Sequence, residues 1–124
     1  MNTQEQAIGF TNGSPFSNGY VAGDTLYIAG QQGPDSKGKV TGIDIRRQTT
    51  NAIAAVGQVA EEAGFQMSDI ISVTIYITDM KDVPTMNEVY NKLMPDPKPA
   101  RVAVQVVGLI GGAKIEISAI AVRH

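Results

Sequence analysis

Two charged side chains stand in the last apolar stretch of the chain, PKPARVAVQVVGLIGGAKIEISAIAV. Arg101 begins one run of β-branched residues, and Glu116 lies within the next. A guanidinium can hold a carboxylate ligand through two parallel hydrogen bonds. A carboxylate can hold a water molecule or move a proton. The two residue types together could therefore hold a carboxylate ligand beside a positioned water molecule.

A cross-strand ion pair on a solvated sheet face is the structural alternative, and it would contribute up to about 1 kcal/mol. The small, apolar neighbours of both charges favour a cleft or an interface instead. If the two runs pair as a hairpin, a turn at Gly111-Gly112 or at Gly108-Leu109 puts Arg101 and Glu116 on the same face, because strand residues alternate between faces. The sequence does not determine which register forms.

The first half of the chain carries clear turn and cap residues. The stretch YVAGDTLYIAG, residues 20–30, predicts two short strands around a Gly23-Asp24 turn. Asp44 predicts the N-cap of a helix that ends at Gly64. Its predicted apolar face consists of residues at helical spacing: Ala52, Val56, Val59 and Ala63.

The second half begins with the strongest strand pattern, DIISVTIYITDM. Apolar and polar side chains alternate there, with Ile71, Val73, Ile75 and Ile77 on the predicted buried face. A second helix is predicted to begin at the cap Asp82 and to end before three prolines, Pro95, Pro97 and Pro99. Its predicted buried face is formed by Val83, Met86, Tyr90 and Leu93.

These elements predict a single α+β domain, residues 1–124, in two layers: one sheet covered on one face by two helices. The other sheet face is predicted to carry small or weakly polar side chains. Its predicted members are Thr74, Tyr76, Ala103 and Gln105. Such a face often packs against another subunit, so we expect a homo-oligomer.

Composition narrows the function classes. The 124 residues include no cysteine, and the net charge of -2 disfavours nucleic acid as a partner. The N-terminus has no signal-peptide pattern and no apolar run reaches the ~20 residues of a membrane span, so we expect a cytoplasmic protein with no membrane association. The single histidine, His124, is given no role, which leaves no Ser-His triad. No metal site is predicted, because Asp35, Asp79 and Asp82 fit turn and cap positions.

Several segments resemble the RidA (YjgF) family of enamine/imine deaminases. The most specific are PARVAVQVVGL and AKIEISAIAVR near the C-terminus. SPFSNGYVAGDTLYIAGQQGPD, EEAGF, SDIISVTIYITD and MNEVYNKLM extend the resemblance over nearly the whole chain. The resemblance implies a chorismate-mutase-like fold and homotrimers with three clefts between subunits.

The same resemblance implies a function. Known members hydrolyse reactive 2-enamine and 2-imine acids of the 2-aminoacrylate type to a 2-keto acid and ammonia, without a cofactor. The expected small-molecule partner is therefore an imino or keto acid. A non-catalytic trimeric binder of small carboxylates is the alternative. An endoribonuclease or translation inhibitor, a label given to some members, is disfavoured by the acidic charge balance.

Positions that match the family's motifs identify candidate site residues in this chain. Arg101 matches the carboxylate-binding arginine and Glu116 the acidic residue that places the attacking water. Gly30 matches a backbone position that lines the cleft. Phe16 stands where most members have tyrosine, and Asn87 falls where many have asparagine. The chain also departs from the family at cleft positions: it has Ala29 for serine, Ala103 for cysteine, Ser118 for a second acidic residue, and Gly111-Gly112 for a proline and a charged residue.

Overall fold

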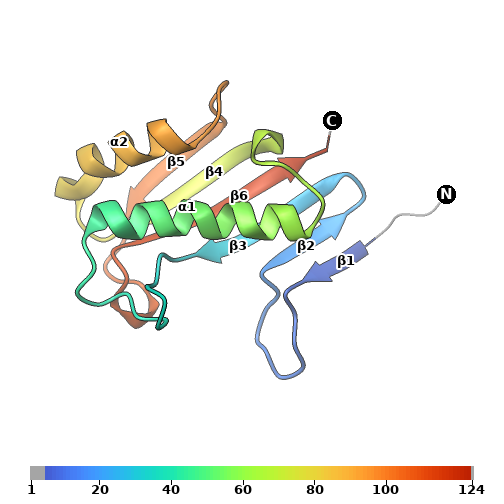
Figure 1. Cartoon of the computed structure of the whole chain (residues 1–124), viewed down its shortest axis with the longest axis horizontal. Helices are drawn as coiled ribbons and strands as arrows, with labels where there is room; N and C mark the ends of the chain where they lie inside the picture. The colour runs from blue at the N-terminus through green and yellow to red at the C-terminus, as the bar shows by residue number, and fades with distance from the viewer. Residues whose placement is uncertain (1–4, 124) are drawn as a thin grey trace.

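The structure, a computed structural model, describes residues 5–123 and contains one six-stranded sheet with the order β1-β2-β3-β6-β4-β5. Residues 1–4 and His124, to which no role was assigned, lie outside the described part. Two helices, α1 (Ile45–Glu62) and α2 (Val83–Leu93), cover the same face of the sheet (Figure 1). The predicted two-layer α+β architecture is therefore confirmed. The strands are β1 (Glu5–Ile8), β2 (Gly19–Ala22), β3 (Thr25–Gln31), β4 (Ile70–Ile77), β5 (Ala100–Gln105) and β6 (Ile115–Val122).

The first half of the chain folds largely as predicted. Strands β2 and β3 form a hairpin in which Gly23 has a φ of 62°, a conformation that suits glycine in a two-residue turn. The side chain of Asp44 accepts a hydrogen bond of 2.8 Å from the backbone N–H of Arg47 and caps α1. Strand β1 was not predicted, because four residues, EQAI, are too few to show a period. On α1, Ala52, Val56 and Val59 are buried as predicted, whereas Ala63 is its half-buried C-cap.

Strand β4 lies inside the sheet, where its alternating pattern predicts it. Val73, Ile75 and Ile77 are buried beneath the helices. The register of β4 against β6 shifts between Ile70 and Ser72. Because of this irregularity, Ile70 is buried and Ile71 is 47% exposed, so the prediction that Ile71 faces the core was wrong.

The last two strands do not form a hairpin. Strand β5 pairs in parallel with one edge of β4, and β6 pairs antiparallel with the other edge. The hairpin prediction followed the tendency of successive strands to pair. Here the connection between β5 and β6 passes the end of β4, with a hydrogen bond from Val106 N–H to the Ile77 carbonyl and another from Thr78 N–H to the Lys114 carbonyl. The strongly apolar β4 thereby gains a neighbour on each edge.

This topology changes the composition of the open sheet face, the one without helices. Directly paired residues share a face, and Thr74 and Tyr76 pair with Val102 and Val104. Ala103 and Gln105, which were predicted for this face, lie on the helix side instead. The open face is thus more apolar than predicted, and Val102 is 56% exposed.

Helix α2 also differs in detail from its prediction. Met86, Val89 and Tyr90 are buried, whereas Leu93 is 45% exposed, so the prediction that Leu93 lies on the buried face was wrong. Asp82 is the N-cap by position but makes no side-chain cap bond.

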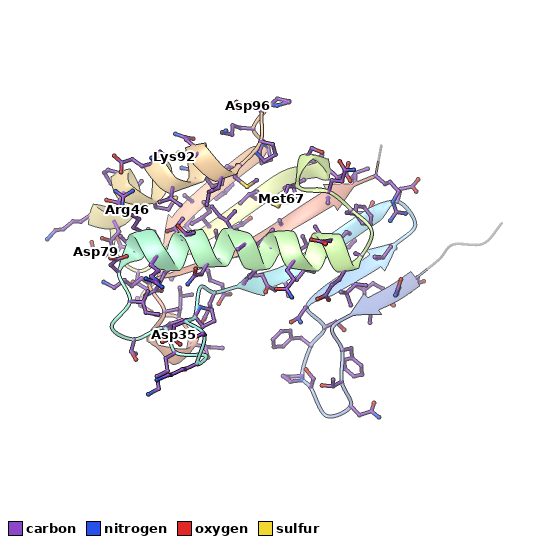
Figure 2. The ribbon with its side chains drawn as sticks, in the orientation of Figure 1. Asp35, Arg46, Met67, Asp79, Lys92 and Asp96 are labelled. Atoms are coloured by element: carbon purple, nitrogen blue, oxygen red, sulfur yellow. The ribbon has the colours of Figure 1, made fainter. Side chains whose placement is uncertain are left out.

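A short 3₁₀ turn, η2 (Met80–Asp82), precedes α2, and the carboxylate of Asp79 caps it by accepting a bond from Lys81 N–H. An ion pair of 2.6 Å between Arg46 and Glu88 joins the two helices at the surface, where Arg46 projects from the start of α1 (Figure 2). The hydrogen bond from Arg46 holds the pKa of Glu88 below its usual value. No helix among residues 5–123 has the length and apolar character of a membrane span.

Candidate functional site

Glu116 lies on the open side of β6 and lines a cavity of about 420 Å³. Its neighbours along β6, Ile115 and Ile117, are buried on the opposite face against the helices. The cavity is bounded by the end of β3, by the connection between β1 and β2, and by η3 (Ile110–Gly112). Its lining residues are Phe16, Ala29, Gly30, Gln32, Ile110 and Glu116.

The carboxylate of Glu116 is held by two features of the chain after β3. The side-chain amide of Gln32 donates one hydrogen bond of 3.0 Å to Oε1 of Glu116 and another of 2.9 Å to the Ile110 carbonyl. Gly30 lies against the other oxygen: a Cβ at this position would collide with Oε2 of Glu116. Only glycine therefore leaves the carboxylate its present place. Three predicted site residues, Phe16, Gly30 and Glu116, meet in this cavity.

Arg101 lies on the other side of the sheet, at its β5 edge. Its guanidinium carbon lies 4.9 Å from the centre of the Tyr90 ring, and its Nη1 lies 4.0 Å from the sulfur of Met86, both on α2. Within residues 5–123 Arg101 forms no ion pair. The guanidinium is exposed and therefore open to an acid ligand.

Tyr90 forms the platform beneath this guanidinium. Burial raises the pKa of its phenol, an effect that the positive charge of Arg101 opposes. Its hydroxyl is buried and has no hydrogen-bond partner among the described residues. Asn87, half-buried, lies on the same helix between Met86 and Tyr90. Arg101 of β5 and the residues of α2 that it contacts form one surface, the β5–α2 surface, and Asn87 lies on the same helix.

Within one chain, the structure does not bring Arg101 and Glu116 together. Arg101 pairs with Val73, which faces the helices, and Glu116 pairs with Tyr76, which faces away from them. Two strand spacings and three residues separate their alpha carbons by about 14 Å. The prediction that the two share a face was wrong, because it assumed that β5 and β6 are neighbours.

Gln32 was not identified from the sequence as a functional residue. The stretch QQGPDSKGK has the composition of a loop, and a glutamine in a loop carries no periodic signal. Its position two residues after Gly30 was the only available indication. Its importance depends on the approach of β6, which is 84 residues away in sequence.

The sequence matches the protein family described as Endoribonuclease L-PSP over residues 7–123. The chain belongs to the RidA (YjgF) family. The crystal structure of RidA from an Antarctic Psychrobacter species superposes with a TM-score of 0.87 at 29% identity, covering 94% of this chain and 98% of that one. The resemblance read from the sequence is thereby confirmed.

Relatives of this RidA-family chain carry two kinds of name. A RutC family protein of Pyrococcus horikoshii is 43% identical, over 89% of this chain and 88% of its own length. The human 2-iminobutanoate/2-iminopropanoate deaminase is 32% identical, over 88% of this chain and 80% of its own length. E. coli TdcF, solved with bound serine, is 33% identical with a TM-score of 0.85, covering 95% of this chain and 94% of that one.

Proposed function

We propose that this chain is a hydrolytic deaminase of 2-enamine and 2-imine acids, acting in clefts between the subunits of a homotrimer. The observation that carries the proposal is the Arg101 guanidinium, which is exposed and stacked on Tyr90 without an ion-pair partner among residues 5–123. Such a group is suited to hold a substrate carboxylate through two hydrogen bonds. The deaminase named among the relatives and the serine bound to TdcF support a small acid bearing nitrogen as the ligand.

In the proposed assembly, a complete site combines residues from two subunits. Since Arg101 and Glu116 lie on opposite faces of one sheet, a site that uses both must take one from each of two subunits. All six residues of β5 are exposed, and the adjoining open face carries Val102 and Val104. An exposed apolar surface of this kind favours association. The β5–α2 surface of one subunit would then face the Glu116 cavity of the next.

The chemistry needs positioning rather than a cofactor. An enamine acid tautomerises to an imine, whose C2 carbon is already electrophilic. Water held by Glu116 attacks C2, the electrons of the C=N bond move to nitrogen, and a proton from the water reaches that nitrogen through the carboxylate. In the resulting carbinolamine the hydroxyl proton passes through the carboxylate to the amino nitrogen, the C=O bond forms, and the C–N bond breaks to release ammonia and the 2-keto acid. Holding the acid and the water in place can lower such a barrier by several kcal/mol.

Ribonuclease activity, suggested by the description of the matched family, has less support. A net charge of -2 disfavours binding to a polyanion. Among residues 5–123 of one chain, those that line the cavity, including Phe16, Ile110 and Glu116, have no basic side chain.

The proposal is tested by generating 2-aminoacrylate from serine with a dehydratase and following the appearance of the keto acid. The wild-type chain should accelerate release, and Arg101→Ala should abolish the acceleration while the protein stays folded by circular dichroism. Calorimetry with a 2-keto acid separates the alternative, since a non-catalytic binder would bind through Arg101 without turnover. Equal, slow rates for wild type and variant would rule out the deaminase.

A further inference from the structure

We propose that Gln32 is the positioning residue for Glu116, fixing which carboxylate oxygen is offered to the attacking water. The inference rests on the proposed deaminase function and deepens it. Gln32 donates to Oε1 of Glu116 at 3.0 Å, while Oε2 accepts no hydrogen bond from any residue in the range 5–123. Oε2 is therefore the oxygen that remains for a water molecule.

Both hydrogens of the Gln32 amide have a partner. The second bond, 2.9 Å to the Ile110 carbonyl, joins Gln32 to the η3 turn, whose Ile110 also lines the cavity. A carboxylate on a strand is free to rotate about its terminal bonds unless a donor fixes it. The amide of Gln32, fixed in turn by Ile110, supplies that donor in a set direction. One side chain thus orients the carboxylate and links it to a wall of the cavity.

The segments that carry Gln32 and Glu116 both contact one buried residue, Gln48 of α1, the first through its backbone and the second through its side chain. Gln48 is fully buried, and its Oε1 accepts a bond of 2.9 Å from the N–H of Lys114, two residues before Glu116. Gly33, next to Gln32, packs so closely on the Gln48 carbonyl that no Cβ would fit. The contact between Gln32 and Glu116 is therefore set by the packed interior.

This arrangement predicts a specific kinetic signature. Gln32 contacts the group that aims the water, whereas the substrate acid is held in the proposed assembly by the arginine of a neighbouring subunit. Loss of Gln32 should therefore lower kcat and leave KM nearly unchanged. A misdirected water or base costs about 10- to 100-fold in rate.

The experiment measures kcat and KM of imine hydrolysis for wild type, Gln32→Met and Gln32→Glu. Gln32→Met keeps the length of the side chain and removes both donors, and Gln32→Glu keeps its shape and adds a like charge beside Glu116. Gln58→Met, on the exposed side of α1, is the matched control. We expect kcat to fall by about 10- to 100-fold in both Gln32 variants, with KM within about twofold and the control unchanged.

Each other outcome is decisive. Folded Gln32 variants with wild-type kcat overturn the inference and leave the deaminase function intact. A rise in KM without a fall in kcat also overturns it, because it would make Gln32 part of the binding wall. If Gln58→Met loses as much rate, the effect is not specific to Glu116. A wild-type protein without turnover defeats the proposed function, and the inference falls with it.

Discussion

Arg101 and Glu116 lie on opposite faces of one sheet, with β4 between their strands. Arg101 lies over the ring of Tyr90 on α2. Glu116, on the other face of the sheet, accepts a hydrogen bond from Gln32. Neither side chain can reach the other without crossing the packed layer between them. The two residues can therefore share a site only if the arginine comes from one subunit and the glutamate from another, an arrangement that the proposed closed ring allows.

Mixed assemblies should recover activity that neither parent has. Arg101→Ala and Glu116→Gln are each expected to lose deaminase activity. After the two are unfolded together and refolded in equal amounts, half of the subunits supply an intact arginine and half an intact glutamate, so about a quarter of the sites should be complete. Activity is measured after refolding, with each variant refolded alone as the control. Mixed rings that form but stay inactive would place both residues of each site in the same subunit.

Association should depend on the open sheet face. Val104→Asp puts a charge on this face, where Val104 is 40% exposed in the single chain, and burying an unpaired charge is costly. We expect sedimentation to show oligomers for wild type and a shift to monomers for Val104→Asp. Leu93→Asp is the control and should stay oligomeric, because Leu93 has a similar exposure of 45% but lies on the α1 side of α2, beside Ile53 and Gly57. The opposite pattern would move the interface to the helices.

Tyr90 should affect substrate affinity through its ring rather than its hydroxyl. Tyr90→Phe removes a buried hydroxyl that has no partner among residues 5–123, so KM should not change. Tyr90→Leu removes the aromatic face under Arg101, and a cation–π contact of about 0.5–1 kcal/mol corresponds to a two- to fivefold rise in KM. Steady-state kinetics measures both. A rise of equal size in Tyr90→Phe would show that the hydroxyl itself serves the site.

Local patterns predicted much of this fold. The Gly23-Asp24 turn, the Asp44 cap and the alternation in β4 each depend on neighbouring residues, so the sequence shows them directly. The alternation predicted two layers and a buried face. It could not predict strand order, because both edges of β4 offer equivalent hydrogen bonds and only the whole chain decides which strand takes which edge.

The sequence predicted several residues of the candidate site, but not how they are arranged in space. Residue type and strand pattern singled out Arg101 and Glu116, and the resemblance added Gly30. In the structure these residues lie on two separate surfaces. Gln32 could not be found, since its two bonds reach residues 78 and 84 positions away. Contacts of this kind appear only when the sheet is assembled.

Gly30 should be intolerant of even one added methyl group. In Gly30→Ala the new Cβ would occupy the place of Oε2 of Glu116, and the half-buried carboxylate would have to swing away from the cavity. We expect kcat to fall by about 10- to 100-fold, with the unfolding midpoint nearly unchanged because the backbone of Gly30 is not left-handed. Gly108→Ala is the matched control, since nothing lies within 4 Å of its added Cβ. Kinetics and thermal unfolding of both variants measure the difference, and full activity in Gly30→Ala would show that Glu116 works from another position.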